Sequence, residues 1–99
     1  MGTQAMSEVT KRVLISGKVQ GVWFRAWTVE QATRLHLRGW VRNRKDGRVE
    51  ALIAGPSHIV DDLVELCHQG PPMAKVESVE VETSGETAPE AGFGQRPTA

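Results

Sequence analysis

The sequence predicts an α+β fold in which two helices cover one face of a mostly antiparallel sheet. Two kinds of pattern support this prediction. Several short stretches carry apolar residues at alternate positions, which is typical of strands. Two longer stretches carry apolar residues three and four positions apart, which is typical of amphipathic helices. In chain order the patterns read strand, helix, strand, strand, helix, strand, with a short final strand.

The first strand is predicted over residues 9–16, where Val13 and Ile15 alternate with their neighbours in a largely buried pattern. A helix is predicted over residues 24–37, and Gly39 is expected to end it, because glycine suits the left-handed conformation at a helix C-terminus. Its buried face is expected to hold Phe24, Thr28, Ala32 and Leu35, with Trp27 and Gln31 beside them.

A hairpin is predicted in the middle of the chain. Its strands cover residues 40–44 and 48–54, and the turn Lys45-Asp46-Gly47 contains the Asp-Gly pair that favours tight hairpins. The residues expected on one face of the second hairpin strand are Val49, Ala51 and Ile53. This arrangement predicts that the two central strands pair directly with each other.

A second helix is predicted after Gly55-Pro56, with Ser57 as its N-cap. The run Gly70-Pro71-Pro72 is expected to end it, because proline cannot continue a helix. The buried stripe is expected to hold Ile59, Val60, Leu63, Leu66 and Cys67.

The last third of the chain predicts two further strands. Val76, Val79 and Val81 indicate a fourth strand, which is expected to be irregular because their spacing changes parity. A polar loop is predicted over residues 84–92 and a short final strand over residues 93–96. The complete order predicts a ferredoxin-like α/β sandwich, βαββαβ plus a short C-terminal strand, with a sheet of four to five strands.

Length and composition limit the possible classes of function. The 99 residues predict one domain over residues 8–99, preceded by a disordered leader over residues 1–7. Twelve Lys and Arg balance twelve Asp and Glu, so no strong general attraction to nucleic acid is expected. The single cysteine, Cys67, excludes an internal disulfide and a CxxC metal site. No apolar run approaches the roughly eighteen residues of a membrane helix, and a cytoplasmic protein is expected.

A candidate anion site lies at residues 17–25, between the first strand and the first helix. A glycine-bounded turn at a helix N-terminus leaves backbone N–H groups that can converge on one anion, and the helix dipole adds roughly half a positive charge. Arg25 adds a planar fork of donors that matches phosphate oxygens. The alternative is an ordinary tight turn with a solvated arginine. The stretch has neither the Gly-Lys-Ser/Thr of a Walker loop nor the GxGxxG of a dinucleotide turn.

A second candidate is Asn43, near the end of the predicted strand 40–44. It shares its side of the strand with Val41 and Gly39, opposite to Arg42 and Arg44. It can therefore face the glycine loop and offer a donor and an acceptor to a bound water. The alternative is a turn residue that caps its own neighbours.

The motif Gly17-x-Val19-Gln20-Gly21-Val22-x-Phe24-Arg25 and the later block Gly39-Trp40-Val41-Arg42-Asn43-x-x-x-Gly47-x-Val49, followed by Gly55, resemble the two signature blocks of the acylphosphatase family. The resemblance has no gap within either block and covers roughly residues 9–97. The ending Phe93-x-Gln95-Arg96-Pro97 also resembles bacterial members.

The resemblance implies hydrolysis of acyl phosphates to a carboxylate and inorganic phosphate, without a metal or organic cofactor. It implies that Arg25 and Asn43 are catalytic. The implied phosphate cradle consists of the backbone N–H groups of Val19, Gln20, Gly21, Val22, Trp23 and Phe24. Inorganic phosphate, sulfate or chloride is expected to compete with the substrate. The expected protein is a monomer with no nucleic-acid or membrane partner.

Trp23 stands where some animal members of the family carry a cysteine, and no argument from the sequence directs its side chain toward the chemistry. The rival interpretation of the whole chain is a non-catalytic phosphate- or RNA-binding ferredoxin-like module. The first and third strands lack the exposed aromatic pairs of an RNA-recognition sheet. Trp27 and Trp40 are expected to pack in the fold, and the alternative use is base stacking. The spacing of the three histidines does not match that of metal ligands, so no metal site is expected at His36, His58 or His68.

Overall fold

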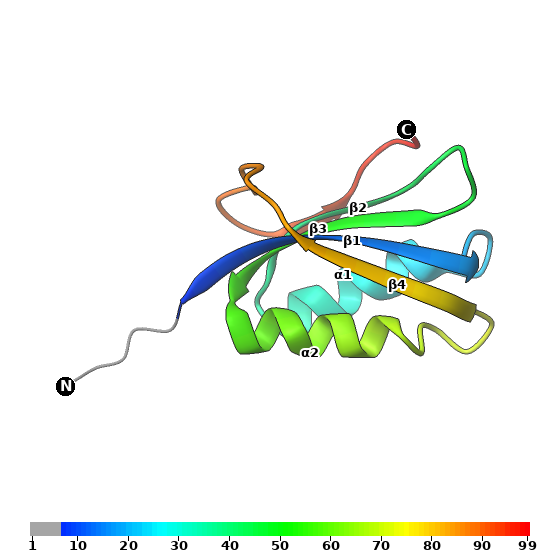
Figure 1. Cartoon of the computed structure of the whole chain (residues 1–99), viewed down its shortest axis with the longest axis horizontal. Coiled ribbons are helices and arrows are strands. Elements are labelled where there is room, and N and C mark those ends of the chain that lie inside the picture. The colour runs from blue at the N-terminus through cyan, green and yellow to red at the C-terminus, as the bar shows by residue number, and fades with distance from the viewer. Residues whose placement is uncertain (1–6) are drawn as a thin grey trace.

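The computed structural model describes residues 7–99, and the element order matches the predicted one (Figure 1). The elements are β1 (Glu8–Lys18), α1 (Phe24–Arg34), β2 (Arg38–Asn43), β3 (Val49–Pro56), α2 (Ser57–Cys67), β4 (Lys75–Thr83) and β5 (Phe93–Gln95). They form a five-stranded sheet in the order β4-β1-β3-β2-β5. The pairing of β5 with β2 is parallel, and the other pairings are antiparallel. The α+β, ferredoxin-like prediction is confirmed.

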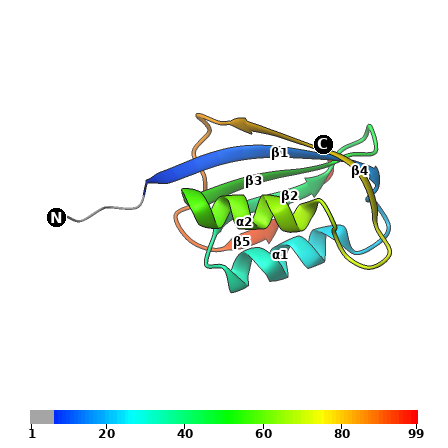
Figure 2. The same ribbon diagram turned by 60° about the horizontal axis from the view of Figure 1, so that its bottom comes forward.

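Both helices lie on the same face of the sheet (Figures 1 and 2). The core between the two layers contains Val13 and Ile15 of β1, together with the predicted face of β3. Core residues contributed by the loop and by the helices include Val22, Phe24, Ala32, Val60, Leu63 and Cys67. The periodicity therefore identified the buried faces, because burial against one layer imposes it.

The first helix is shorter than predicted. It ends at Arg34, and His36 with φ 60° takes the left-handed position assigned to Gly39. The N–H of His36 donates to the carbonyl of Thr33 (3.0 Å), and that of Leu37 donates to the carbonyl of Ala32 (2.9 Å). This pair of bonds is a Schellman motif, which satisfies the last helical carbonyls without a glycine. Gly39 instead lies in β2, where a Cβ would clash with the carbonyl oxygen of Leu52.

The assignment of Ser57 as the N-cap of the second helix is wrong. Ser57 is the first helical residue, and Pro56 holds the cap position with extended backbone and no side-chain hydrogen bond. Because β3 continues through Pro56, the chain passes from strand to helix without a loop. The N–H of Ser57 is satisfied by the carbonyl of Ser7 at 2.9 Å. The predicted leader at 1–7 otherwise lies outside the described residues. Among residues 7–99, both helices have 11 residues, and neither could span a membrane.

The irregularity predicted for the fourth strand is confirmed. The pairing of β1 with β4 changes register between Ser16, opposite Ser78, and Gly17, opposite Val76, so Glu77 is the extra residue of a β-bulge. Gly17 has φ 120°, and a Cβ there would lie 2.3 Å from the carbonyl oxygen of Lys75. The bulge thus requires glycine where β1 enters the candidate loop.

The helix-free face of the sheet contains a buried acid, Glu50 of β3, with no exposed side-chain area. Its carboxylate accepts hydrogen bonds from Arg12 of β1, from Arg42 Nε (2.7 Å) and from Arg44 Nη1 (3.0 Å). Burial raises the pKa of Glu50, but these arginines outweigh burial and the pKa is lower than usual. One carboxylate therefore ties β1, β3 and the end of β2 together.

Candidate active site

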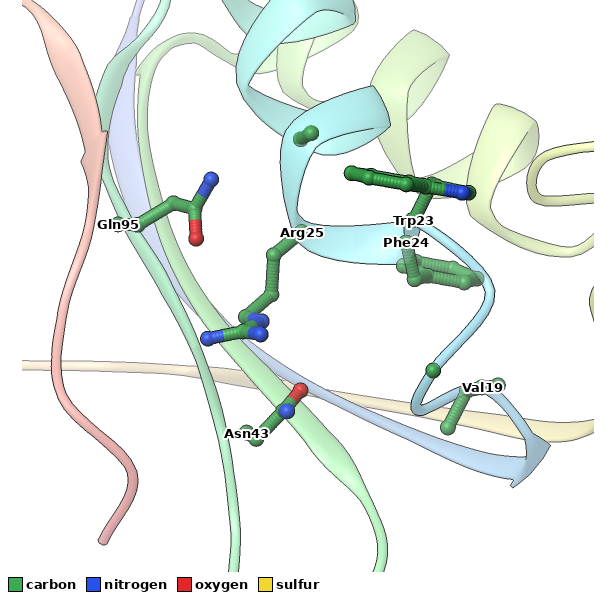
Figure 3. A pocket seen from close by; sticks show the side chains of 8 residues that line it. Val19, Trp23, Phe24, Arg25, Asn43 and Gln95 are labelled. Atoms are coloured by element: carbon green, nitrogen blue, oxygen red, sulfur yellow. The ribbon is translucent and has the colours of Figure 1, made fainter.

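A pocket of about 290 Å³ opens at the N-terminus of α1 (Figure 3). Its walls come from the loop between β1 and α1, the first turn of α1, the end of β2, and β5. The lining residues are Val19, Gly21, Trp23, Phe24, Arg25, Ala26, Asn43 and Gln95. The structure therefore brings the two candidate sites of the sequence, Arg25 and Asn43, into one cavity.

The loop from residue 19 to 24 curls through two left-handed positions, Gly21 with φ 75° and Trp23 with φ 69°. Within residues 7–99, the backbone N–H groups of residues 19–26 donate to no backbone carbonyl and to no side chain. The first N–H with a partner is that of Trp27, which donates to the carbonyl of Trp23 at 2.9 Å. The loop and the first turn of the helix thus present a group of unsatisfied donors.

The side chain of Arg25 projects from the first turn of α1 into the pocket (Figure 3). It is half-buried, and it forms no ion pair with any acid in the described part of the chain. The first turn of α1 also contains no acidic residue. The N-terminal end of the helix dipole and the guanidinium are both positive, so positive potential accumulates at this end of the pocket, and no acid of residues 7–99 pairs with Arg25 to offset it.

Asn43 is the last residue of β2, and its side chain points toward Arg25 (Figure 3). Its neighbours Arg42 and Arg44 point to the other face of the sheet, where both donate to Glu50. The strand alternation thus directs Asn43 toward the helices. Among residues 7–99 its amide has no hydrogen-bond partner, so the alternative of a local cap does not describe this side chain.

Two of the predicted cradle residues, Gln20 and Val22, do not line the pocket, although their backbone belongs to the loop. The side chain of Val22 is buried in the core. The amide of Gln20 points away and donates to the carbonyls of Arg44 (2.7 Å) and Arg48 (2.9 Å). The other four predicted cradle residues, Val19, Gly21, Trp23 and Phe24, do line the pocket.

Three features of the pocket were not expected from the sequence. Trp23 lines the pocket and is 80% exposed, although nothing in the sequence directed its side chain there. Gln95 reaches the pocket from β5, and Ala26 from the helix. Gln95 lies two residues after the apolar Phe93, so in a strand both side chains would point to the same face. That spacing does not predict that β5 lies beside β2.

Comparisons with known proteins agree with this architecture. The family model described as Acylphosphatase matches residues 11–94. A protein named Acylphosphatase from Rhizorhabdus wittichii is 51% identical over 98 residues, which cover 98% of this chain and 97% of that protein. The acylphosphatase crystal structure from Bacillus subtilis is 36% identical and has a TM-score of 0.84, covering 89% of this chain and 98% of that one.

A second solved structure, of an acylphosphatase from Coxiella burnetii, is 37% identical with a TM-score of 0.85, covering 90% of this chain and 93% of that chain. Sequence and fold therefore agree over nearly the whole length of each protein compared. The resemblance drawn from the two motif blocks is confirmed, and the chain belongs to the acylphosphatase family of hydrolases.

Proposed function

We propose that the chain hydrolyses the carboxyl-phosphate bond of acyl phosphates, with the phosphoryl group held by the 19–24 loop and Arg25 and with the attacking water oriented by Asn43. The observation that carries the proposal is that one pocket holds three kinds of polar group that have no hydrogen-bond or ion-pair partner among residues 7–99. These are the backbone N–H groups of the loop, the guanidinium of Arg25 and the amide of Asn43.

The phosphoryl group matches the donor side of the pocket. Backbone N–H groups at a helix N-terminus are directed at a bound anion, and the dipole favours negative charge there. Arg25 can place two parallel N–H groups on two phosphoryl oxygens. In the transition state, negative charge spreads over the equatorial oxygens, so the same donors stabilise it.

Asn43 is suited to the nucleophile. Its amide offers both a donor and an acceptor, which can fix a water in position and orientation. Phosphoryl transfer requires the attacking and leaving oxygens to lie roughly in line with phosphorus, so correct placement of the water contributes much of the rate.

The leaving group explains why so few residues are needed. As water oxygen bonds to phosphorus, the bond between phosphorus and the acyl oxygen breaks, and its electron pair leaves with the carboxylate. A carboxylate is a weak base and requires no general acid. Among the described residues, the pocket lining contains no carboxylate, histidine or lysine to serve as base. The proton of the water is therefore assigned to a phosphoryl oxygen of the substrate.

Hydrolysis of benzoyl phosphate, followed by ultraviolet absorbance, tests the proposal. Arg25→Ala and Asn43→Ala are each expected to lower kcat by on the order of 10²–10³. Arg34→Ala is the matched control, because Arg34 is an exposed arginine at the other end of α1 with no role in the pocket. Wild-type rates in both pocket variants would remove the site assignment.

A comparison of substrates tests the reaction class. Acyl phosphates are expected to be hydrolysed and ordinary phosphate monoesters are not, because an alkoxide is a poor leaving group without a general acid. Rapid hydrolysis of monoesters would contradict the proposed mechanism. An inactive but folded wild-type chain would favour the non-catalytic phosphate-binding interpretation.

A further inference from the structure

Trp23 combines two properties that packing does not explain. Its side chain is 80% exposed, although tryptophan is usually largely buried. Its backbone is left-handed, with φ 69° and ψ 20°, a conformation that is uncommon for bulky residues and that clusters at functional sites. A glycine or asparagine would suit this position better. The indole nevertheless lies at the pocket wall, which indicates that it contacts a molecule bound in the pocket.

Gln95 lines the same pocket and lies on the other side of Arg25 from Trp23 (Figure 3). The parallel pairing of β5 places Gln95 beside Val41, and the N–H of Arg96 donates to the carbonyl of Val41 at 2.9 Å. Arg96 lies on the helix-free face, with its guanidinium carbon 4.9 Å from the centre of the Trp40 ring. Strand alternation then directs Gln95 toward the helices. Its amide has no hydrogen-bond partner within residues 7–99.

The pocket lining combines one positive side chain, Arg25, with neutral groups on either side of it (Figure 3). The positive groups, Arg25 and the N-terminus of α1, match a phosphoryl group, whereas Trp23 and Gln95 carry no charge. A volume of about 290 Å³ lies near the lower end of the range for small-molecule sites, so the pocket has room for more than a phosphoryl group. The neutral groups therefore match the remaining half of an acyl phosphate, a carbonyl with an organic substituent.

We propose that Trp23 and Gln95 form the subsite for the acyl half of the substrate. The indole ring of Trp23 packs against a planar acyl substituent, and the side-chain N–H of Gln95 donates to the acyl carbonyl oxygen. The substrate class is then acyl phosphates with aromatic or other planar acyl groups, in preference to small aliphatic ones. This inference rests on the proposed hydrolysis of acyl phosphates.

The proposed contact of Trp23 with the acyl substituent is tested by the ratio of kcat/KM for benzoyl phosphate to kcat/KM for acetyl phosphate. Trp23→Asn keeps a residue that tolerates the left-handed backbone and is expected to lower the benzoyl-to-acetyl ratio about 3- to 10-fold, the range of an aromatic contact. Trp23→Phe is expected to retain most of the preference. Met73→Asn is the matched control, because Met73 is another exposed large apolar residue and lies outside the pocket.

The Gln95 half predicts a different pattern. Gln95→Leu is expected to lower kcat/KM for both substrates about 2- to 10-fold, because each has the same carbonyl oxygen, and to leave their ratio unchanged. The competitive inhibition constant of inorganic phosphate is expected to stay at the wild-type value in both Trp23→Asn and Gln95→Leu. Gln69→Leu, an exposed glutamine outside the pocket, is the control.

The outcomes distinguish failure of the acyl subsite from failure of the proposed hydrolysis. Hydrolysis by the wild-type chain with an unchanged benzoyl-to-acetyl ratio in Trp23→Asn would overturn the subsite and leave the proposed function standing. A weakened phosphate inhibition in Gln95→Leu would move Gln95 to the phosphate site and overturn its acyl role. No wild-type hydrolysis of either substrate would overturn both. Circular dichroism checks folding, and Trp23→Gly replaces Trp23→Asn if the latter unfolds.

Discussion

The side-chain amide of Gln20 donates hydrogen bonds to the carbonyl oxygens of Arg44 (2.7 Å) and Arg48 (2.9 Å). Arg44 directly follows Asn43, and its N–H closes the hairpin by donating to the carbonyl of Arg48 at 2.8 Å. One side chain of the loop therefore fixes the distance between the backbone donors of the loop and the end of β2. The two parts of the candidate site come from different elements, so this bridge defines their geometry.

Gln20→Ala is expected to lower kcat about 10- to 100-fold, because small misplacements of reacting groups are costly. Loss of the two hydrogen bonds is expected to reduce the free energy of unfolding by about 1–3 kcal/mol. Steady-state kinetics and urea denaturation measure the two effects. Gln20→Glu is expected to be worse than Gln20→Ala, because a carboxylate would face two carbonyl oxygens. A wild-type kcat in Gln20→Ala would show that the bridge does not position the site.

Two glycines of the first motif are expected to respond differently to alanine. Gly17→Ala places a Cβ 2.3 Å from the carbonyl oxygen of Lys75 at φ 120°, and a loss of at least about 2 kcal/mol of stability is expected. Gly21→Ala has nothing within 4 Å of its Cβ, so only the left-handed backbone cost of about 1–2 kcal/mol is expected. Urea denaturation of both variants gives the comparison. A larger loss for Gly21→Ala would contradict the contacts seen at Gly17.

The buried acid on the helix-free face predicts a dependence of stability on low pH. The pKa of Glu50 is lower in the folded chain than its ordinary value near 4.3, so the folded state binds this proton more weakly than the unfolded state. The stabilisation is therefore complete above about pH 4.3 and is lost as pH falls through the folded pKa. Glu50→Gln is expected to cost about 3 kcal/mol at pH 7, because Arg12, Arg42 and Arg44 lose the buried carboxylate that they share, and among residues 7–99 only Arg12 and Arg44 keep other acidic partners.

Urea denaturation between pH 7 and pH 3 measures this effect. The gap in unfolding free energy between the wild type and Glu50→Gln is expected to narrow as pH falls. Glu30→Gln, at an exposed position on α1, is the control and is expected to change little at any pH. A gap that widens toward acid would have the wrong sign and would refute the ion-pair role of Glu50.

The buried cysteine predicts that the stability of the fold depends on pH in the alkaline range. Burial raises the pKa of Cys67 to about 12, well above the value near 8.5 in an unfolded chain. Above about pH 8.5 the unfolded thiol ionises and the folded one does not, so stability is expected to fall as pH rises. Cys67→Ala is expected to remove this alkaline loss. A thiol reagent at pH 8 should react only through unfolded molecules, and rapid labelling of the folded chain would contradict the burial of the thiol.

Inorganic phosphate is expected to inhibit benzoyl phosphate hydrolysis competitively, and sulfate and chloride are also expected to compete with the substrate. The reason is that, in the proposed mechanism, the loop N–H groups and Arg25 recognise an anion by charge and donor geometry. Arg25→Lys keeps the charge and loses the planar fork, so its phosphate inhibition constant is expected to rise. Purely noncompetitive inhibition by phosphate would place the anion outside the substrate pocket.

The elements that were predictable are those whose signal is local. Alternation at Val13 and Ile15 and the parity change after Val76 reflect contacts that repeat along a single strand, and both appear in the structure. The errors fall at helix ends. His36 takes the left-handed position after α1, and the burial of Leu37 stabilises this Schellman turn. A bulky residue at the left-handed position has no local sequence signal.

The order of the elements and the family motifs could be predicted before the structure was known, as could the candidate residues Arg25 and Asn43, because each prediction uses residue types and spacing within a short segment. The folded structure was needed to show that β5 lies parallel to β2 and brings Gln95 to the pocket. It also decided that the exposed ring of Trp23 stands at the pocket wall. The physical reason is that pairing between segments distant in the chain depends on the packing of all the elements together, and spacing within one segment does not encode it.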